Sequence, residues 1–119
     1  MRITGQQVRD ALIRALADDY SRKILLGTLE KARSVEELSQ SLEIPISTAY
    51  RRVNELKEVG LLTVEKTIIT NEGKKFELYR GAFRGINMQL EKGEIVVDVE
   101  LNEDVAMRLS RLWTSMRSG

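Results

Sequence analysis

The chain contains neither cysteine nor histidine. Without cysteine there are no disulfides, thiolate metal sites, thiol redox sensors or cysteine nucleophiles. Without histidine there are no serine–histidine triads, no histidine general bases and few zinc sites. The acidic pairs at 18–19 and 36–37 do not replace them, because adjacent side chains on a helix splay about 100° apart. We therefore predict a protein that is not an enzyme and that holds no cofactor or metal.

Proline, long apolar runs and an excess of one charge are also scarce. Proline occurs once, and no apolar run approaches the roughly 20 residues of a membrane span. The first ten residues lack the apolar stretch of a secretory signal. Lys and Arg total 19 against 18 Asp and Glu, a net charge of +1, which excludes a polybasic histone-like or membrane-binding protein. We expect a cytoplasmic protein with no membrane partner. Its 119 residues suit one domain, or one domain plus a short appendage.

Apolar residues recur at helical spacing in the first half of the chain. Residues 4–17 form one stripe, in which Val8, Leu12 and Leu16 share a face. A second helix is expected to begin with Asp19 or Ser21 as its cap. Its buried stripe is predicted to comprise Ile24, Leu25, Leu29 and Ala32.

Two further helices are predicted between residues 34 and 59. Ser34 followed by Glu37 matches the capping-box pattern, and the helix that it opens is expected to be about eight residues long. Pro45 suits the first turn of the next helix, over about residues 45–59, and Gly60 suits its end. The inward stripe of this helix is predicted to be Ile46, Ala49, Val53 and Leu56.

The period then changes to that of strands. Residues 61–70 are rich in β-branched side chains, 71–73 are turn residues and 75–80 alternate, which predicts a β-hairpin. A second hairpin is predicted over 86–101, with its turn at 91–94. The sequence leaves three roles open for this second hairpin: extending the sheet of the first hairpin, building a dimer, or binding another molecule. Asn102 is expected to cap a last helix over about 103–117.

Three helices followed by a hairpin are the element order of a winged helix-turn-helix. We therefore predict an α+β fold: a winged helix-turn-helix over residues 1–81, with an additional C-terminal β-hairpin and a C-terminal dimerisation helix over 82–119. In such a fold the second helix of the pair enters the DNA major groove. The polar face and flanks of helix 45–59 supply the candidate DNA-binding residues Ser47, Thr48, Tyr50, Arg51 and Arg52. The alternative is that this face is only solvated.

The turn of the first hairpin offers Lys74 and Lys75, which suit phosphate contacts, although Glu72 reduces the positive field. The alternative is that these lysines protect an exposed strand edge from aggregation.

Dimerisation is predicted because an operator with two half-sites needs a two-fold protein. The alternative for the last helix is docking onto its own domain. The predicted dimerisation residues lie on the first and last helices: Val8, Leu12, Leu16, Val105, Leu109, Leu112, Trp113 and Met116.

The stretch from residue 16 to 62 resembles archaeal winged-helix regulators of the ArsR-like group. The resemblance is carried by residues 24–26, 34–38, 46–52 and 56–62 and extends over about the first 80 residues. It implies a homodimeric transcription regulator that binds double-stranded DNA. Metal-sensing members use cysteine and histidine ligands, and this chain has neither, so sensing through soft ligands is excluded. The resemblance identifies no small-molecule effector.

A second class of function is a winged-helix module that binds proteins and not DNA. Residues 1–80 carry 14 basic and 12 acidic side chains, which is only +2, and the remaining residues carry 5 and 6, which is −1. A mobility shift at low and high salt separates this class from a DNA-binding regulator.

Overall fold

The computed structural model describes residues 1–105. The helices are α1 (Gln6–Ala17), α2 (Asp19–Gly27), α3 (Val35–Leu42) and α4 (Ile46–Glu58). The strands are β1 (Arg2–Ile3), β2 (Leu62–Ile69), β3 (Lys75–Gly81), β4 (Phe83–Glu91) and β5 (Glu94–Leu101). The predicted helix 103–117 falls mostly outside the described residues, and so do Leu109, Leu112, Trp113 and Met116.

Helix α2 begins and ends earlier than its sequence pattern indicated. Asp18, and not Asp19 or Ser21, is the N-cap, because its carboxylate accepts a hydrogen bond of 2.8 Å from the backbone N–H of Ser21. The helix ends at Gly27, so Leu29 and Ala32 are not on it. Both residues lie in the loop that follows α2, where Leu29 is half-buried and Ala32 is buried.

Helix α3 follows its prediction closely. The Ser34 hydroxyl accepts a hydrogen bond of 3.2 Å from the backbone N–H of Glu37, and the Glu37 carboxylate accepts one of 3.4 Å from the backbone N–H of Ser34. This reciprocal arrangement is the capping box. The helix is eight residues long and buries Val35 and Leu38.

Helix α4 confirms three of the four predicted inward residues. Ala49, Val53 and Leu56 are buried, but the Ile46 side chain is 48% exposed. Pro45 is the N-cap rather than a first-turn residue, so Ile46 stands in the first turn, beyond the edge of the packed interface. Gly60 follows the helix with a φ of 83°, a left-handed conformation that favours glycine.

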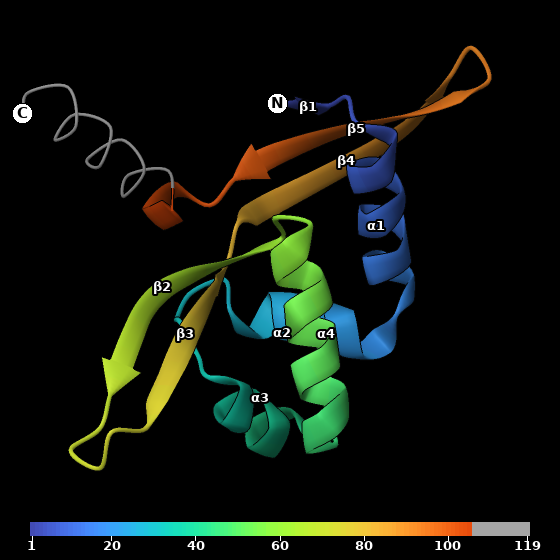
Figure 1. Ribbon diagram of the computed structural model, residues 1–119. Coiled ribbons are helices and arrows are strands. Elements are labelled where there is room, and N and C mark those ends of the chain that lie inside the picture. Colours follow the sequence, from blue (N-terminus) through green and yellow to red (C-terminus); the bar gives the residue numbers. More distant parts are fainter. Residues whose placement is uncertain (106–119) are drawn as a thin grey trace, which may run out of the picture.

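Strands β2 and β3 form the first predicted hairpin, antiparallel, with an irregularity between Val64 and Lys66. Tyr79 of β3 exchanges two backbone hydrogen bonds with Arg33, of 2.8 and 3.0 Å. This bridge fastens the hairpin to the loop that precedes α3. The hairpin therefore stands beside the α3–α4 pair, as the wing of a winged helix-turn-helix (Figure 1).

Strands β4 and β5 form the second hairpin, and they belong to a different sheet from the wing. This sheet has the order β1-β5-β4 and is antiparallel. Its first strand, β1, was not predicted, because two residues are too short to show alternation. Val97 and Val99 of β5 join Leu12 and Ile24 in the hydrophobic core. In Figure 1 the hairpin lies across the end of α1, and its turn extends beyond that helix.

Candidate nucleic-acid interface

The face of α4 opposite its buried stripe is open to solvent. Ser47, Arg51 and Asn54 are exposed, and Thr48 is half-buried. The buried stripe fixes the helix against α2 and α3, so the polar face can only point outward. Among residues 1–105, Arg51 makes no ion pair and no side-chain hydrogen bond. Its guanidinium is therefore available to a partner molecule.

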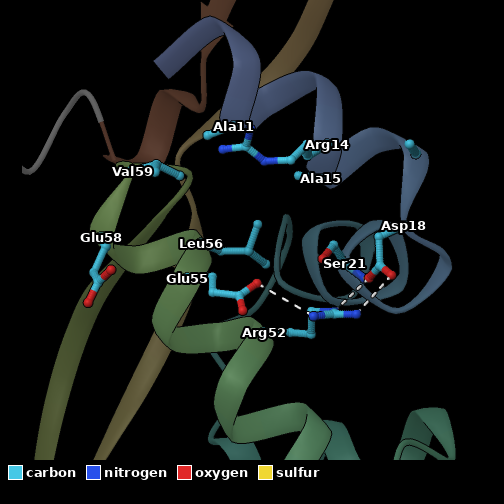
Figure 2. A pocket seen from close by; sticks show the side chains of 11 residues that line it. Ala11, Arg14, Ala15, Asp18, Ser21, Arg52, Glu55, Leu56, Glu58 and Val59 are labelled. Atoms are coloured by element: carbon cyan, nitrogen blue, oxygen red, sulfur yellow. Dashed lines mark hydrogen bonds and ion pairs between the residues drawn. The ribbon is translucent and has the colours of Figure 1, made fainter. Parts of the chain in front are cut away.

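Arg52, the next residue, is held within the chain. Its Nε lies 2.9 Å from Asp18 Oδ2 and its Nη2 lies 3.2 Å from Asp18 Oδ1, which is a bidentate pair. A second carboxylate, that of Glu55, lies 3.6 Å from Nη1. Figure 2 shows this arginine reaching from α4 to the junction of α1 and α2. The Nε and Nη2 atoms of Arg52 are therefore engaged within the chain.

The Arg52–Asp18 pair lies at one end of a groove of about 690 Å³ between α1 and α4. Ala11 and Ala15 of α1 and Leu56 and Val59 of α4 supply its apolar walls. Arg14 also lines this groove (Figure 2). Burial raises the pKa of the Asp18 carboxyl, but the Ser21 hydrogen bonds and the Arg52 guanidinium outweigh burial and leave the pKa below its usual value of 3.8.

Tyr50 is also engaged within the chain. Its hydroxyl donates a hydrogen bond to Glu36 of α3. This hydrogen bond, with the charge of Lys74 as a smaller contribution, lowers the pKa of the Glu36 carboxyl, and it raises the pKa of Tyr50. The tyrosine ring remains partly exposed, whereas its polar end joins α4 to α3. The sequence did not indicate this pairing, because the two residues are 14 positions apart and meet only when the helices pack.

The turn of the wing is built around Thr70 and Gly73. The Thr70 N–H donates to the Lys74 carbonyl at 2.8 Å, and the Thr70 hydroxyl accepts from the Lys74 N–H at 3.1 Å. Gly73 has a φ of 83°, which closes the turn. Both Lys74 and Lys75 are exposed, and neither forms an ion pair among the described residues. The wing therefore carries two available cations.

The predicted dimerisation residues on α1 differ in exposure. Leu12 is fully buried in the core of its own chain, whereas Val8 and Leu16 are half-buried. Val105, which alone among the dimerisation residues predicted on the last helix lies within the described range, is buried as well. Dimerisation through these residues remains a prediction.

Two further findings bear on other kinds of site. Within residues 1–105, no group of three or more acidic side chains is arranged to hold a metal ion. Over the same residues, none of the helices has the length and apolar character needed to cross a membrane.

Comparison with known proteins supports the helix-turn-helix. Residues 16–65 match the family model described as a helix-turn-helix domain, and this range includes α2, α3 and α4. No curated protein matches the chain significantly. Among solved structures, HlyU from Vibrio cholerae N16961 is similar, with 23% sequence identity over 91% of this chain and 94% of that chain and a TM-score of 0.43. The helix-turn-helix match and the β2–β3 hairpin that follows α4 together make a winged helix-turn-helix, in which α3 and α4 are the helix pair and β2–β3 is the wing.

Proposed function

We propose that this protein is a transcription regulator that binds double-stranded DNA in a sequence-specific manner as a homodimer. The observation that carries the proposal is the exposed polar face of α4 with its unpaired arginine, Arg51, on the second helix of a helix-turn-helix. A guanidinium that no carboxylate neutralises is the side chain best suited to the O6 and N7 atoms of guanine.

Each part of the proposed interface has its own role. Helix α4 enters the major groove with Arg51 toward base edges, and Ser47 and Thr48 toward phosphates or bases near the helix start. The wing lysines, Lys74 and Lys75, lie on the DNA backbone as point charges. Arg52 holds α4 in place through Asp18, and Tyr50 does the same through Glu36.

We further propose that the regulator belongs with the ArsR-like archaeal group and acts in the cytoplasm. The division into a DNA-binding part, 1–81, and a dimerisation appendage, 82–119, is part of the same proposal. The support for it is the resemblance of residues 16–62 and the apolar stripe at the C-terminal end of the sequence.

The second candidate function is a winged-helix module that binds another protein. This function is favoured by the small net charge of residues 1–80, which is only +2. Glu36 also places a carboxylate next to Tyr50, at the edge of the proposed DNA-reading face. A phosphate backbone is repelled by such a charge, whereas a protein surface need not be.

The test is selection of bound sequences from a random DNA pool, followed by mobility shifts with Arg51→Ala and with Arg2→Gln. Arg2 lies on β1, in the other sheet, so the control removes one positive charge away from α4. Arg51→Ala should weaken binding to the selected sequence about 5- to 150-fold, equivalent to roughly 1–3 kcal/mol, and should relax preference at one base pair. Enrichment of no sequence by the wild-type protein would favour the protein-binding module.

A further inference from the structure

Strand β4 has an open outer edge. In the sheet order β1-β5-β4 it is the last strand, and it pairs with no other strand among the described residues on that side. It is nine residues long, and residues 85–90 of it include neither a charged residue nor a proline. Soluble proteins usually protect so long an edge with such residues, because the free N–H and C=O groups invite another strand.

The apolar face of this sheet is covered over the middle of β5 and is open along β4 and at both ends of β5, where Ile95 is 38% and Leu101 37% exposed. Val97 and Val99 of β5 are buried, and they stand opposite Met88 and Ile86 of β4. Exposure rises along β4 toward its turn: Ile86 is half-buried, Met88 is 40% exposed and Leu90 is 85% exposed. The two most exposed apolar side chains of this face, Met88 and Leu90, therefore lie along the open edge.

The turn of the hairpin determines which backbone groups point outward. Lys92 and Gly93 both have positive φ, 50° and 80°, as in the two-residue turns that flank a hydrogen-bonded pair. That pair is Glu91 with Glu94. Alternation along an antiparallel strand then directs the N–H and C=O groups of Leu90, Met88 and Ile86 away from β5, to the open edge.

We propose that a second copy of this chain pairs with β4 along this edge, antiparallel, about a two-fold axis that passes through Asn87. This register sets Ile86 opposite Met88 of the partner subunit, and Met88 opposite Ile86 of the partner subunit. It places apolar residues together and leaves no like charges directly opposite within 84–90. It also joins the outward-pointing backbone groups of the two strands in hydrogen-bonded pairs.

A pocket at the base of the same strand supports this choice of partner. It has a volume of about 170 Å³ and a mainly apolar lining formed by Leu16, Arg22, Leu25, Leu26, Leu29, Leu61, Phe83, Arg84 and Ile86. The proposed register brings Leu90 of the partner subunit to Arg84, where β4 is irregular between Phe83 and Gly85, beside this pocket. Leu90 is the most exposed large apolar side chain among the described residues, and in the proposed dimer it enters this apolar pocket. The two-fold axis repeats the contact in the other subunit.

The symmetry also suits DNA binding. An axis perpendicular to the sheet leaves both copies of each helix on the same face of the joined sheet, so the two α4 helices face the same side, as two half-sites require. The inference rests on the homodimer proposed above and identifies a surface that forms it.

The test uses single cysteines, since the native chain has none. Asn87 and Gln89 are both exposed on β4. In the proposed dimer the two Asn87 Cα atoms are about 4.5 Å apart, within reach of a disulfide, whereas the two Gln89 Cα atoms are about 13 Å apart. Under mild oxidation without DNA, Asn87→Cys should become a covalent dimer and Gln89→Cys should not. Equal crosslinking of the two variants would overturn the proposal.

A second variant tests the side chain that enters the pocket. Leu90 is so exposed that Leu90→Ser should leave the unfolding midpoint of the monomer unchanged, while dimerisation measured by sedimentation should weaken on the order of 100-fold. A wild-type chain that sediments as a monomer at tens of micromolar, or a Leu90→Ser dimer of unchanged affinity, would also overturn it. A monomeric wild type would also overturn the proposed homodimer, whereas a Leu90→Ser dimer of unchanged affinity would overturn only this surface. Sequence selection by α4 is a separate measurement that neither result changes.

Discussion

Two adjacent arginines on α4 illustrate how position decides the role of a residue. Arg51 and Arg52 are rotated by about 100° from one another around the helix axis. That rotation leaves Arg51 in solvent and turns Arg52, 24% exposed, toward the Asp18 carboxylate. The two residues are identical in chemistry, yet only one guanidinium is free to bind another molecule.

At this scale we expect Arg52→Met to destabilise the fold by about 1–2 kcal/mol near neutral pH, because it removes a bidentate charged hydrogen bond that is only partly exposed. The matched control, Arg51→Met, should leave stability unchanged. Urea unfolding of the three proteins measures the difference. A loss of stability in the control equal to that of Arg52→Met would refute the assignment.

The same pair predicts a dependence on pH. The pKa of Asp18 is lower in the folded chain than its usual 3.8, so its contribution to stability is present above pH 3.8 and is lost as the pH falls below that value. The gap in unfolding free energy between the wild-type protein and Arg52→Met should therefore narrow between pH 5 and about pH 2. A gap that stays constant over this range would contradict the pairing.

At the scale of elements, α3 depends on its cap. The helix is only eight residues long, so the Ser34–Glu37 capping box satisfies a large share of its free N–H groups. Ser34→Ala should cost about 1 kcal/mol of unfolding free energy, measured by chemical denaturation. Ser34→Thr keeps a hydroxyl at the same place and should lose much less. An alanine variant as stable as the wild type would show that the cap is dispensable.

The wing gives the second prediction about an element. Replacing Lys74 and Lys75 with alanine should weaken binding to every DNA sequence by a similar factor. The slope of log affinity against log salt should fall by up to about two, close to one for each lost phosphate contact. Stability should change by less than about 0.5 kcal/mol, because both side chains are exposed. If the lysines only protect a strand edge, the salt slope will stay the same and aggregation will begin earlier.

At the scale of the whole molecule, Asn102 joins three segments. Its fully buried amide donates to the carbonyls of Leu29 (2.9 Å) and Gly81 (3.0 Å), and its side-chain oxygen accepts from the backbone N–H of Asp104 (3.2 Å). Asn102→Ala should cost about 2–4 kcal/mol, because the Gly81 carbonyl loses this buried donor, the Leu29 carbonyl keeps only Arg80 Nε, and the hydrogen bond to the Asp104 N–H is lost. Thermal unfolding measures this loss, and Asn54→Ala on the exposed face of α4 is the control. Similar midpoints for the two variants would argue against this role.

The sequence pattern did not predict contacts between residues that are far apart in the chain. The sequence predicted Asn102 as a helix cap, and its side-chain oxygen accepts a hydrogen bond from the Asp104 N–H, but the contacts with Leu29 and Gly81 were not predicted. It placed Arg51 on the polar face of α4 and Arg52 at the flank, but it did not identify Asp18 as the partner of Arg52. Both failures concern contacts between residues far apart in the chain, since periodicity records only which face of an element is buried.

Local chemistry determined the order and type of the main elements. Capping residues, β-branched runs and turn glycines act over a few positions, so the helix pair, the wing and the second hairpin were all predicted from the sequence by itself. Packing decided the rest. Strand β1 exists because β5 offers it a partner, and Arg52 is engaged because α1 and α2 bring Asp18 to it. The open edge of β4 follows from which strands the chain folds side by side, and that choice is made by long-range contacts.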